Sequence, residues 1–183
     1  MRAVLCTLLL VIASAAGAAG LEGKPAPVVE LNARDGTAHA LAAIAADKPV
    51  VVVFWASWCP YCKALLPELA KRVAARGGGE RIAVVAINVF EEAQADARAY
   101  IDANPFPFVW LMKGSKTAKS WKVRGTPGLF LVGRGGVVRY DRAARPLKPE
   151  ATAQPVGTAT SPAKTAMRWL AELERELDAE LAR

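Results

Sequence analysis

Two cysteines near the middle of the 183-residue chain, Cys59 and Cys62, are separated by only two residues. Cysteines at this spacing can form half of a zinc site, a structural disulfide or a redox centre. A zinc site needs two further ligands, and the chain offers only one histidine, His39, and one other cysteine, Cys6. Neither lies near the pair in the sequence, so we expect no metal and no bound cofactor. The spacing therefore favours a redox centre.

The cysteines lie where an expected strand gives way to an expected helix. Residues 50–54 form a β-branched run that ends in an aromatic residue, typical of a central strand covered on both faces. Apolar residues then recur at helical spacing from Pro60 to about residue 76, where three glycines follow. Cys59 would therefore lie at a helix N-terminus, where free N–H groups and the helix dipole favour a thiolate. We expect Cys59 to attack a substrate disulfide and the less exposed Cys62 to resolve the mixed disulfide.

The rest of the chain alternates strand-like apolar runs with amphipathic, helix-like segments, which favours a parallel βαβ layout. Turn residues at 32–36 and at 133–136 each join two short apolar runs and predict hairpins. The expected elements are a first hairpin of 28–31 and 37–41, a strand at 82–89, a helix at 91–104, a strand at 106–112, a short helix at 115–121 and a last hairpin of 129–132 and 137–140.

The first 19 residues have the pattern of a secretory signal peptide. Met1-Arg2 precedes an apolar run, and the small residues that follow offer several Ala-x-Ala cleavage sites. The alternative is an uncleaved membrane anchor, because the apolar run is close to the shortest length that spans a bilayer. Cleavage would remove Cys6 and leave Cys59 and Cys62 as the only cysteines in a compartment where disulfides persist.

We expect one core domain over residues 20–142, followed by two further segments. Residues 143–162 are rich in Pro, Ala and Thr without an apolar period, and they predict an irregular linker. Residues 163–183 predict a helix that packs on the core. The apolar stripe of this helix consists of Met167, Leu170, Leu173, Leu177 and Leu181.

The charge pattern bears on the class of partner. The chain carries 24 Lys and Arg residues against 17 Asp and Glu residues, which gives a formal net charge of +7. The basic residues are dispersed without a dense block, as on an ordinary solvated surface. We therefore expect no nucleic-acid partner.

Three features of the sequence resemble the thioredoxin superfamily. The first is the run Val53-Phe54-Trp55-Ala56-Ser57-Trp58-Cys59-Pro60-Tyr61-Cys62-Lys63, with Pro67 following inside the expected helix. The second is Val123-Arg124-Gly125-Thr126-Pro127, which is similar to the loop of that family that carries a cis-proline opposite the active site. The third is the stretch between Asn88 and Pro127, which is longer than in thioredoxin. With the N-terminal hairpin and the signal peptide, it makes the chain most similar to the TlpA-like periplasmic thiol-disulfide oxidoreductases.

The resemblance implies an α/β, thioredoxin-like fold with a central mixed sheet, an N-terminal hairpin and a helix-strand insertion before the cis-proline loop. It implies that Cys59 and Cys62 are the catalytic residues. The substrate-binding residues that it implies are Trp58, Pro60, Tyr61, Thr126 and Pro127. The implied partners are disulfide-containing or dithiol protein substrates and a membrane redox donor, and the implied location is the periplasm.

The match departs from the family at three positions that bear on proton transfer. Val53 stands where thioredoxin has a buried acid, Ala86 where that acid has a lysine partner, and Leu65 where many TlpA-like reductants have a glutamate. Glu68 is expected on a different helix face from Cys62 and is a poor substitute. Deprotonation of Cys62 must then use water or an acid elsewhere in the chain, which leaves the direction of electron flow open.

Three functions are compatible with the sequence. The leading hypothesis is a periplasmic reductant of protein disulfides, for example in cytochrome c maturation. The alternative within the enzyme class is a disulfide donor or isomerase, which the Pro60-Tyr61 dipeptide and the missing acid favour. The third is a non-enzymatic binding module, such as a copper carrier or a redox-inert chaperone, that uses the same groove. The single histidine counts against copper.

Overall fold

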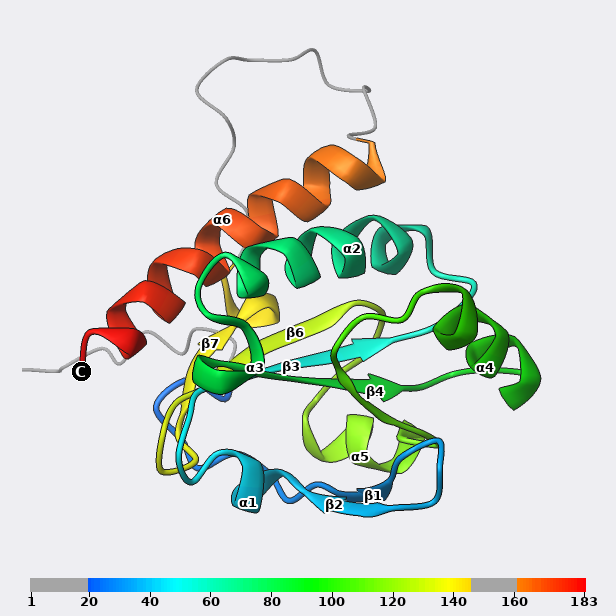
Figure 1. The fold of residues 1–183 in the computed structure, drawn as a ribbon, viewed down its shortest axis with the longest axis horizontal. Helices are drawn as coiled ribbons and strands as arrows, with labels where there is room; N and C mark the ends of the chain where they lie inside the picture. Colours follow the sequence, from blue (N-terminus) through cyan, green and yellow to red (C-terminus); the bar gives the residue numbers. More distant parts are fainter. Residues whose placement is uncertain (1–19, 146–160) are drawn as a thin grey trace, which may run out of the picture.

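A five-stranded mixed sheet lies at the centre of the computed structural model, which describes residues 20–145 and 161–183 (Figure 1). The strand order is β5-β4-β3-β6-β7. Strand β4 runs parallel to β3 and to β5, whereas β6 is antiparallel to β3 and to β7. The expected mixed sheet of a thioredoxin-like fold is therefore confirmed. The strands are β3 (Val50–Trp55), β4 (Ala83–Asn88), β5 (Val109–Leu111), β6 (Gly128–Val132) and β7 (Val138–Asp141).

Strand β3 is the centre of the core, as its β-branched run predicts. All six of its residues are buried, because β4 and β6 flank it and helices or loops cover both of its faces. Val51, Val53 and Trp55 belong to the apolar cluster on one face of the sheet, and the alternate residues belong to the cluster on the other. Burying a side chain of this size stabilises the fold by about 1.5–3 kcal/mol.

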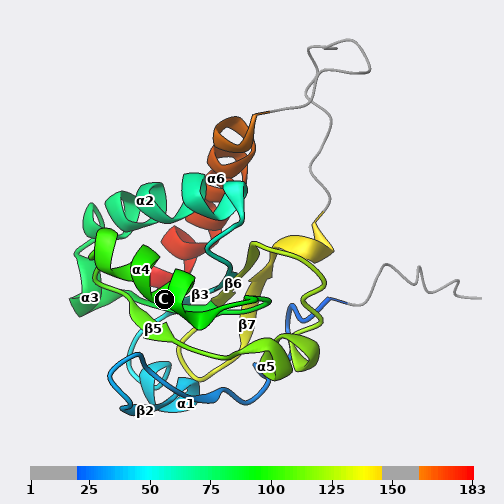
Figure 2. The same cartoon turned by 90° about the vertical axis from the view of Figure 1, so that its right-hand side faces the viewer.

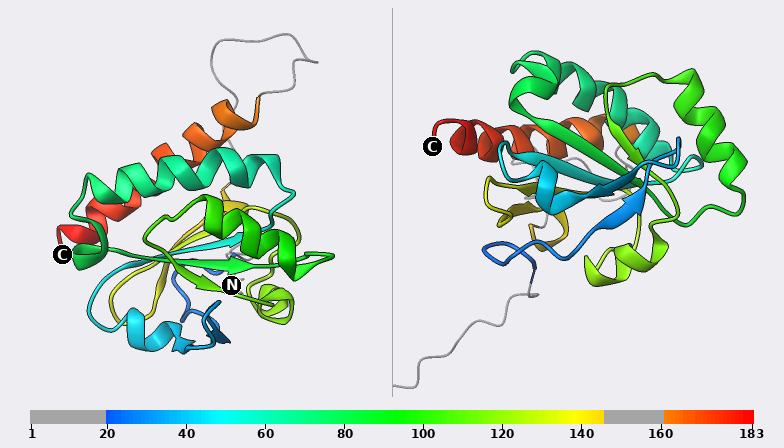
Figure 3. Two further views of the ribbon diagram at one scale, coloured as in Figure 1. Left: turned by 45° about the vertical axis from the view of Figure 1, so that its right-hand side comes forward. Right: turned by 60° about the horizontal axis from the view of Figure 1, so that its bottom comes forward.

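The helices form one layer on each side of the sheet (Figure 2). Helices α2 (Pro60–Ala74), α4 (Gln94–Ala103) and α6 (Pro162–Leu181) contribute buried residues to one cluster. Helices α1 (Leu41–Ile44) and α5 (Ser115–Ser120) lie on the opposite side of the sheet. Figure 3 shows both layers from two further directions. None of the helices in the described ranges is long and apolar enough to cross a membrane.

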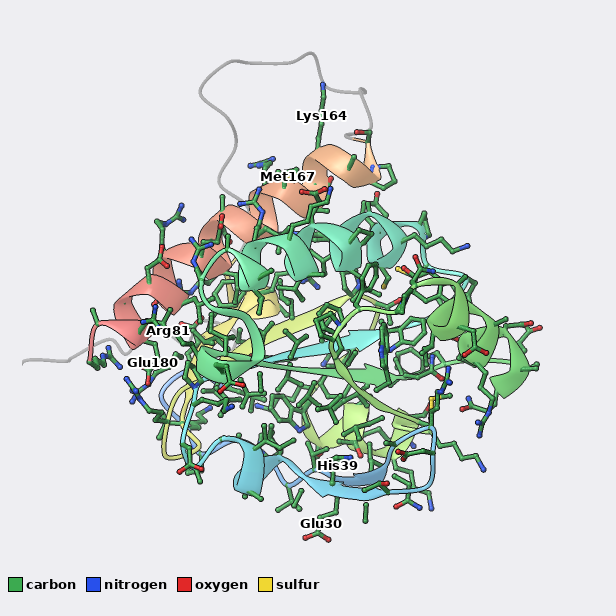
Figure 4. All side chains as sticks on the ribbon, viewed as in Figure 1. Glu30, His39, Arg81, Lys164, Met167 and Glu180 are labelled. Carbon is green, nitrogen blue, oxygen red and sulfur yellow. The ribbon has the colours of Figure 1, made fainter. Side chains whose placement is uncertain are left out.

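The N-terminal hairpin lies on the α5 side of the sheet. Its strands are β1 (Glu30–Asn32) and β2 (Ala38–Ala40). Strand β2 ends before the expected residue 41, because Leu41 already begins α1. An isolated bridge between Ala33 and Leu111 joins the hairpin to β5. His39 therefore lies on the side of the sheet opposite to α2 (Figure 4).

The expected insertion between β4 and the proline loop consists of α4, β5 and α5. Strand β5 extends the sheet at the edge beside β4, with Ala86 opposite Trp110. Helix α4 begins at Gln94, later than the expected start at 91, so Glu91 and Glu92 lie in the preceding loop.

Helix α6 packs against α2 and over β6 and β7 (Figure 1). Most of the expected apolar stripe is buried, but Met167 is wrongly included, because 39% of its surface is exposed. Trp169, two residues further on, is buried instead. Glu180 is also buried and accepts a hydrogen bond from the backbone N–H of Arg134 in the β6–β7 turn, at 3.2 Å.

Hydrogen bonds and ion pairs hold the chain at the end of the first described range and at the start of the second. A short 3-10 helix, η1 (Arg142–Ala144), follows β7, and Arg145 pairs with Glu22 at 2.6 Å and with Glu176 at 2.7 Å. Ser161 caps α6 by accepting a hydrogen bond from the N–H of Lys164. The expected signal peptide with Cys6, and residues 146–160 of the expected linker, lie outside the described residues.

Candidate active site

Cys59 is the N-cap residue of α2, as the strand-to-helix pattern predicts. Its backbone is extended, Pro60 occupies the first helical turn, and its sulfur accepts a hydrogen bond from the N–H of Cys62 at 3.2 Å. Both cysteines are free thiols, with exposed fractions of 2% for Cys59 and 0% for Cys62. A substrate can therefore reach the sulfur of Cys59 only by close approach to the residues that surround it.

The carboxylate of Glu91, in the loop after β4, holds the turn between β3 and α2. Glu91 accepts hydrogen bonds from the backbone N–H of Ser57 at 2.5 Å and from its hydroxyl at 2.9 Å. The side-chain amide of Asn88 donates to the same carboxylate at 2.8 Å. These bonds fix the residue two positions before Cys59. Charge-assisted hydrogen bonds of this kind are stronger than neutral ones.

Glu91 is a residue that the sequence interpretation missed, because it was expected in the first turn of a helix. The signal that could have identified it is its position after a buried strand. Strands β3 and β4 are parallel neighbours, so the loops that follow them meet at the same edge of the sheet. An acidic residue after β4 therefore lies within reach of the turn after β3.

The two tryptophans that flank this turn have different environments. Trp58 is 56% exposed, and its indole N–H donates to the carbonyl of Phe90 at 2.9 Å. Trp55 is fully buried, with its ring centroid 5.1 Å from those of Tyr100 and of Trp110. Trp58 therefore presents an aromatic surface beside Cys59, whereas Trp55 is part of the core.

The loop before β6 lies opposite the cysteines, as the resemblance implies. The Thr126-Pro127 peptide bond is cis, and the thiol of Cys59 donates to the carbonyl of Thr126 at 3.5 Å. On the other side of the motif, the ring of Tyr61 packs against Trp169 of α6, with centroids 5.8 Å apart. The expected site residues thus gather around the N-terminus of α2.

The environment shifts the pKa values of the two thiols in opposite directions. The hydrogen bond from the thiol of Cys62 is the main cause that lowers the pKa of Cys59 to about 6, and bonds from Thr126 and from the N–H groups of Cys62 and Tyr61 add to it. Burial is the main cause that raises the pKa of Cys62, and the hydrogen bond and charge of Cys59 raise it further. The outer thiol therefore loses its proton far more readily than the inner one.

The three positions that depart from the family are apolar. Val53, Leu65 and Ala86 are fully buried in the same cluster as Cys62. Glu68 lies on the surface of α2, where it pairs with Lys71 at 2.7 Å. None of these positions supplies a proton acceptor for Cys62.

A cavity of about 530 Å³ opens next to the cysteine motif. Tyr61 and Thr126 line it near Cys59, and Trp121, Arg142 and Trp169 line its other walls. A second cavity, of about 630 Å³, lies between the N-terminal hairpin and residues 101–110, and His39 lines it. Among the described residues, neither cysteine lines either cavity, but Tyr61 and Thr126 connect only the first cavity to the cysteine motif.

Comparison with known proteins places the chain among thioredoxin-like proteins. Residues 23–141 match the family model described as the AhpC/TSA family. The thiol:disulfide interchange protein DsbE of Yersinia pestis is 32% identical over 128 residues, which cover 67% of this chain and 64% of the relative. The thiol:disulfide interchange protein CycY of Rhizobium leguminosarum bv. viciae is 35% identical over 134 residues, 72% of this chain and 67% of the relative. The chain thus spans just under two thirds of the first of these relatives.

Solved structures give the same fold. The crystal structure of a putative thiol:disulfide interchange protein DsbE from Chlorobium tepidum superposes with a TM-score of 0.66 at 24% identity, over 89% of this chain and 99% of that one. A hypothetical protein from Sinorhizobium meliloti 1021 superposes with the same TM-score at 25% identity, over 88% of this chain and 84% of that one. At these identities the likeness concerns the fold.

The ionisation of Cys59 can be measured by the pH dependence of its alkylation in the reduced protein. Because only the thiolate reacts, the rate should be low below pH 6 and rise with a midpoint near the pKa of about 6, well below the ordinary thiol value of about 8.5. The midpoint should move up in Cys62→Ala, which removes the main stabilising hydrogen bond. A midpoint near 8.5 in the unaltered protein would contradict this account.

Replacing Glu91 with glutamine should loosen the turn before Cys59. The neutral amide weakens the bonds to Ser57, and the loss of a charged acceptor for a part-buried N–H should cost about 1–3 kcal/mol in the free energy of unfolding, measured in urea. Glu92→Gln is the matched control, since Glu92 is exposed and the hydrogen bonds from Ser57 go to Glu91. Equal stabilities of the two variants would contradict the role assigned to Glu91.

Proposed function

The chain belongs to the AhpC/TSA family, and on this basis we propose that it is a periplasmic thiol-disulfide oxidoreductase that exchanges disulfides with protein substrates through Cys59 and Cys62. The observation that carries the proposal is the position of Cys59 at the N-terminus of α2, where its sulfur accepts the N–H of Cys62 and lies opposite the cis-Pro127 loop. The opposite shifts of the two thiol pKa values agree with it. One sulfur is ready to attack, while the other is held protonated until it is needed. The names of the relatives, which are thiol:disulfide interchange proteins, support the same chemistry.

The first step is the attack of the Cys59 thiolate on one sulfur of a substrate disulfide. The S–S bond of the substrate breaks, a mixed disulfide forms with Cys59, and the departing thiolate takes up a proton. Thr126 and Pro127 would offer their backbone to the extended substrate segment, and Trp58, Pro60 and Tyr61 would form the rim around it. The carbonyl of Thr126 lies 3.5 Å from the sulfur of Cys59, which supports a role for this loop in presenting the substrate backbone to the reacting bond.

The second step releases the substrate. Cys62 loses its proton and attacks the sulfur of Cys59, the mixed disulfide breaks, and the substrate leaves as a dithiol while Cys59 and Cys62 form a disulfide. Two electrons pass to the substrate. In the mixed disulfide Cys59 is no longer a thiolate, so both of its contributions to the raised pKa of Cys62, the charge and the hydrogen bond, are removed and burial remains. Because apolar residues surround Cys62, its proton leaves to water.

We assign the reducing direction to the physiological reaction, for example in cytochrome c maturation, with a membrane redox donor that regenerates the dithiol. The insertion, the N-terminal hairpin and the similarity to TlpA-like proteins support this assignment. A second candidate is a disulfide donor or isomerase. The pKa of Cys59 of about 6 favours it, because a stabilised thiolate makes the dithiol form more stable and the disulfide more oxidising.

A variant that lacks the resolving thiol tests the exchange mechanism. Cys62→Ser should accumulate mixed disulfides between Cys59 and substrate proteins in cells, because the second step cannot proceed. Cys59→Ser is the matched control and should trap none. Full activity in Cys59→Ser, or no trapped protein in Cys62→Ser, would exclude direct exchange and favour a binding module.

The reduction potential separates the two directions. For a reductant we expect equilibrium with glutathione at a potential nearer to that of thioredoxin, about −270 mV, than to that of strong periplasmic oxidants, about −120 mV. A value near −120 mV would assign the chain to disulfide donation.

A further inference from the structure

The cavity beside the cysteine motif contains an arginine that is stacked but has no acidic partner. The guanidinium of Arg142 lies 4.7 Å from the ring centroid of Trp169, in the range of a cation–π contact. The same ring packs against Tyr61 of the cysteine motif. Arg142 and Tyr61 thus lie on the walls of one cavity, joined by Trp169.

Arg142 differs from the other half-buried arginines whose contacts the structure describes. Each of those four has an ion pair with a carboxylate: Arg72 with Glu174, Arg76 with Asp178, Arg139 with Glu180, and Arg145 with Glu22. Within residues 20–145 and 161–183, Arg142 has none. Burial is the main cause that lowers its pKa, and the charges of Tyr140, Asp141 and Cys62 oppose this only in part.

The adjacent acid, Asp141, also lines the cavity and its charge acts on Arg142, but the two form no direct ion pair in the described residues. Asp141 is buried, and its two carboxylate oxygens accept hydrogen bonds from the backbone N–H groups of Leu21 and Ala143, each at 3.0 Å. Because Lys122, Arg124 and Arg142 line the cavity against this single acid, the charge of its lining is positive.

Other unpartnered polar groups belong to the same cavity. Among the buried side-chain atoms without a hydrogen-bond partner in the described residues are Nε of Arg142 and Nε1 of Trp121. Both residues line the cavity, and both atoms can donate. Arg124 adds an exposed cation at the rim. A set of donors with surplus positive charge matches an anionic acceptor, and in a protein substrate that acceptor is a carboxylate.

We propose that this cavity binds the carboxylate of an aspartate or glutamate that lies close to the reactive cysteine of the substrate. Thr126 connects the two sites, because it lines the cavity and its carbonyl lies 3.5 Å from the sulfur of Cys59. An extended segment advances about 3.3 Å per residue, so an acid within two or three residues of the target cysteine can reach the cavity. The inference rests on the proposed function and specifies the substrates for which the exchange is fastest.

Two disulfide peptides that differ only in glutamate or glutamine two residues from the cysteine provide the test. The rate of their reduction by the dithiol form of the full chain should be about tenfold higher for the glutamate peptide, a typical effect of one charge-assisted contact. In Arg142→Gln the ratio of the two rates should fall to about one. The ratio cancels any effect of the variant on the thiols, because both peptides meet the same thiols.

Arg98→Gln is the matched control, because it removes the same charge from the exposed surface of α4, where Arg98 contacts only the carbonyl of Arg34. It should keep the wild-type ratio. If the ratio falls equally in Arg98→Gln, the preference is a general effect of net charge and the proposal is overturned.

The remaining outcomes distinguish failure of the carboxylate site from failure of the proposed exchange function. If both peptides are reduced by the wild-type chain at equal rates, or if Arg142→Gln retains the preference, the carboxylate site is excluded while the exchange function stands. If neither peptide is reduced, the proposed function itself fails.

Should Arg142→Gln not fold, Arg142→Lys serves as the second variant. It keeps a cation but loses the planar fork and its stacking, so the ratio should fall severalfold, and an unchanged ratio would overturn the proposal.

Discussion

The contact between the first turn of α2 and the sulfur of Cys59 is the interaction on which the chemistry of this chain depends. Helix N-termini leave N–H groups without partners, and here the N–H of Cys62 donates to that sulfur. A negative sulfur gains most from these groups, whereas a neutral thiol gains less. The same contact therefore caps the helix and prepares the nucleophile.

This contact can activate Cys59 only because neighbouring loops hold its sulfur in place. The loop after β4 supplies Glu91, which binds Ser57, and the loop before β6 supplies the carbonyl of Thr126. Strands β4 and β6 both flank β3, so the two loops reach the N-terminus of α2 from either side. The order of the strands is thus what brings three distant segments of the chain to one site.

Charge around the site is distributed unevenly. On the interior side of the pair, Cys62 is fully buried in the same apolar cluster as Val53, Leu65 and Ala86, and this burial raises the pKa of the inner thiol. The outer side carries Arg142 above Trp169, beside the cavity. An apolar interior slows proton loss from Cys62, and a cationic rim favours anionic partners. The two properties act on different steps of one exchange reaction.

The sequence by itself predicted the strand and helix that position the cysteine pair, because these depend on local patterns of spacing and hydrophobicity, and its resemblance to a known family indicated the proline loop. It did not reveal Glu91, Arg142 or the inward position of Glu180, and it placed Met167 in the buried stripe. These four depend on which surfaces meet after folding. Glu91 contacts Ser57 across 34 positions of the chain, and Arg142 reaches Trp169 of a helix that begins at Pro162. Only the tertiary structure decides such contacts, because no local periodicity records the partner of a long-range ion pair, hydrogen bond or stacked ring.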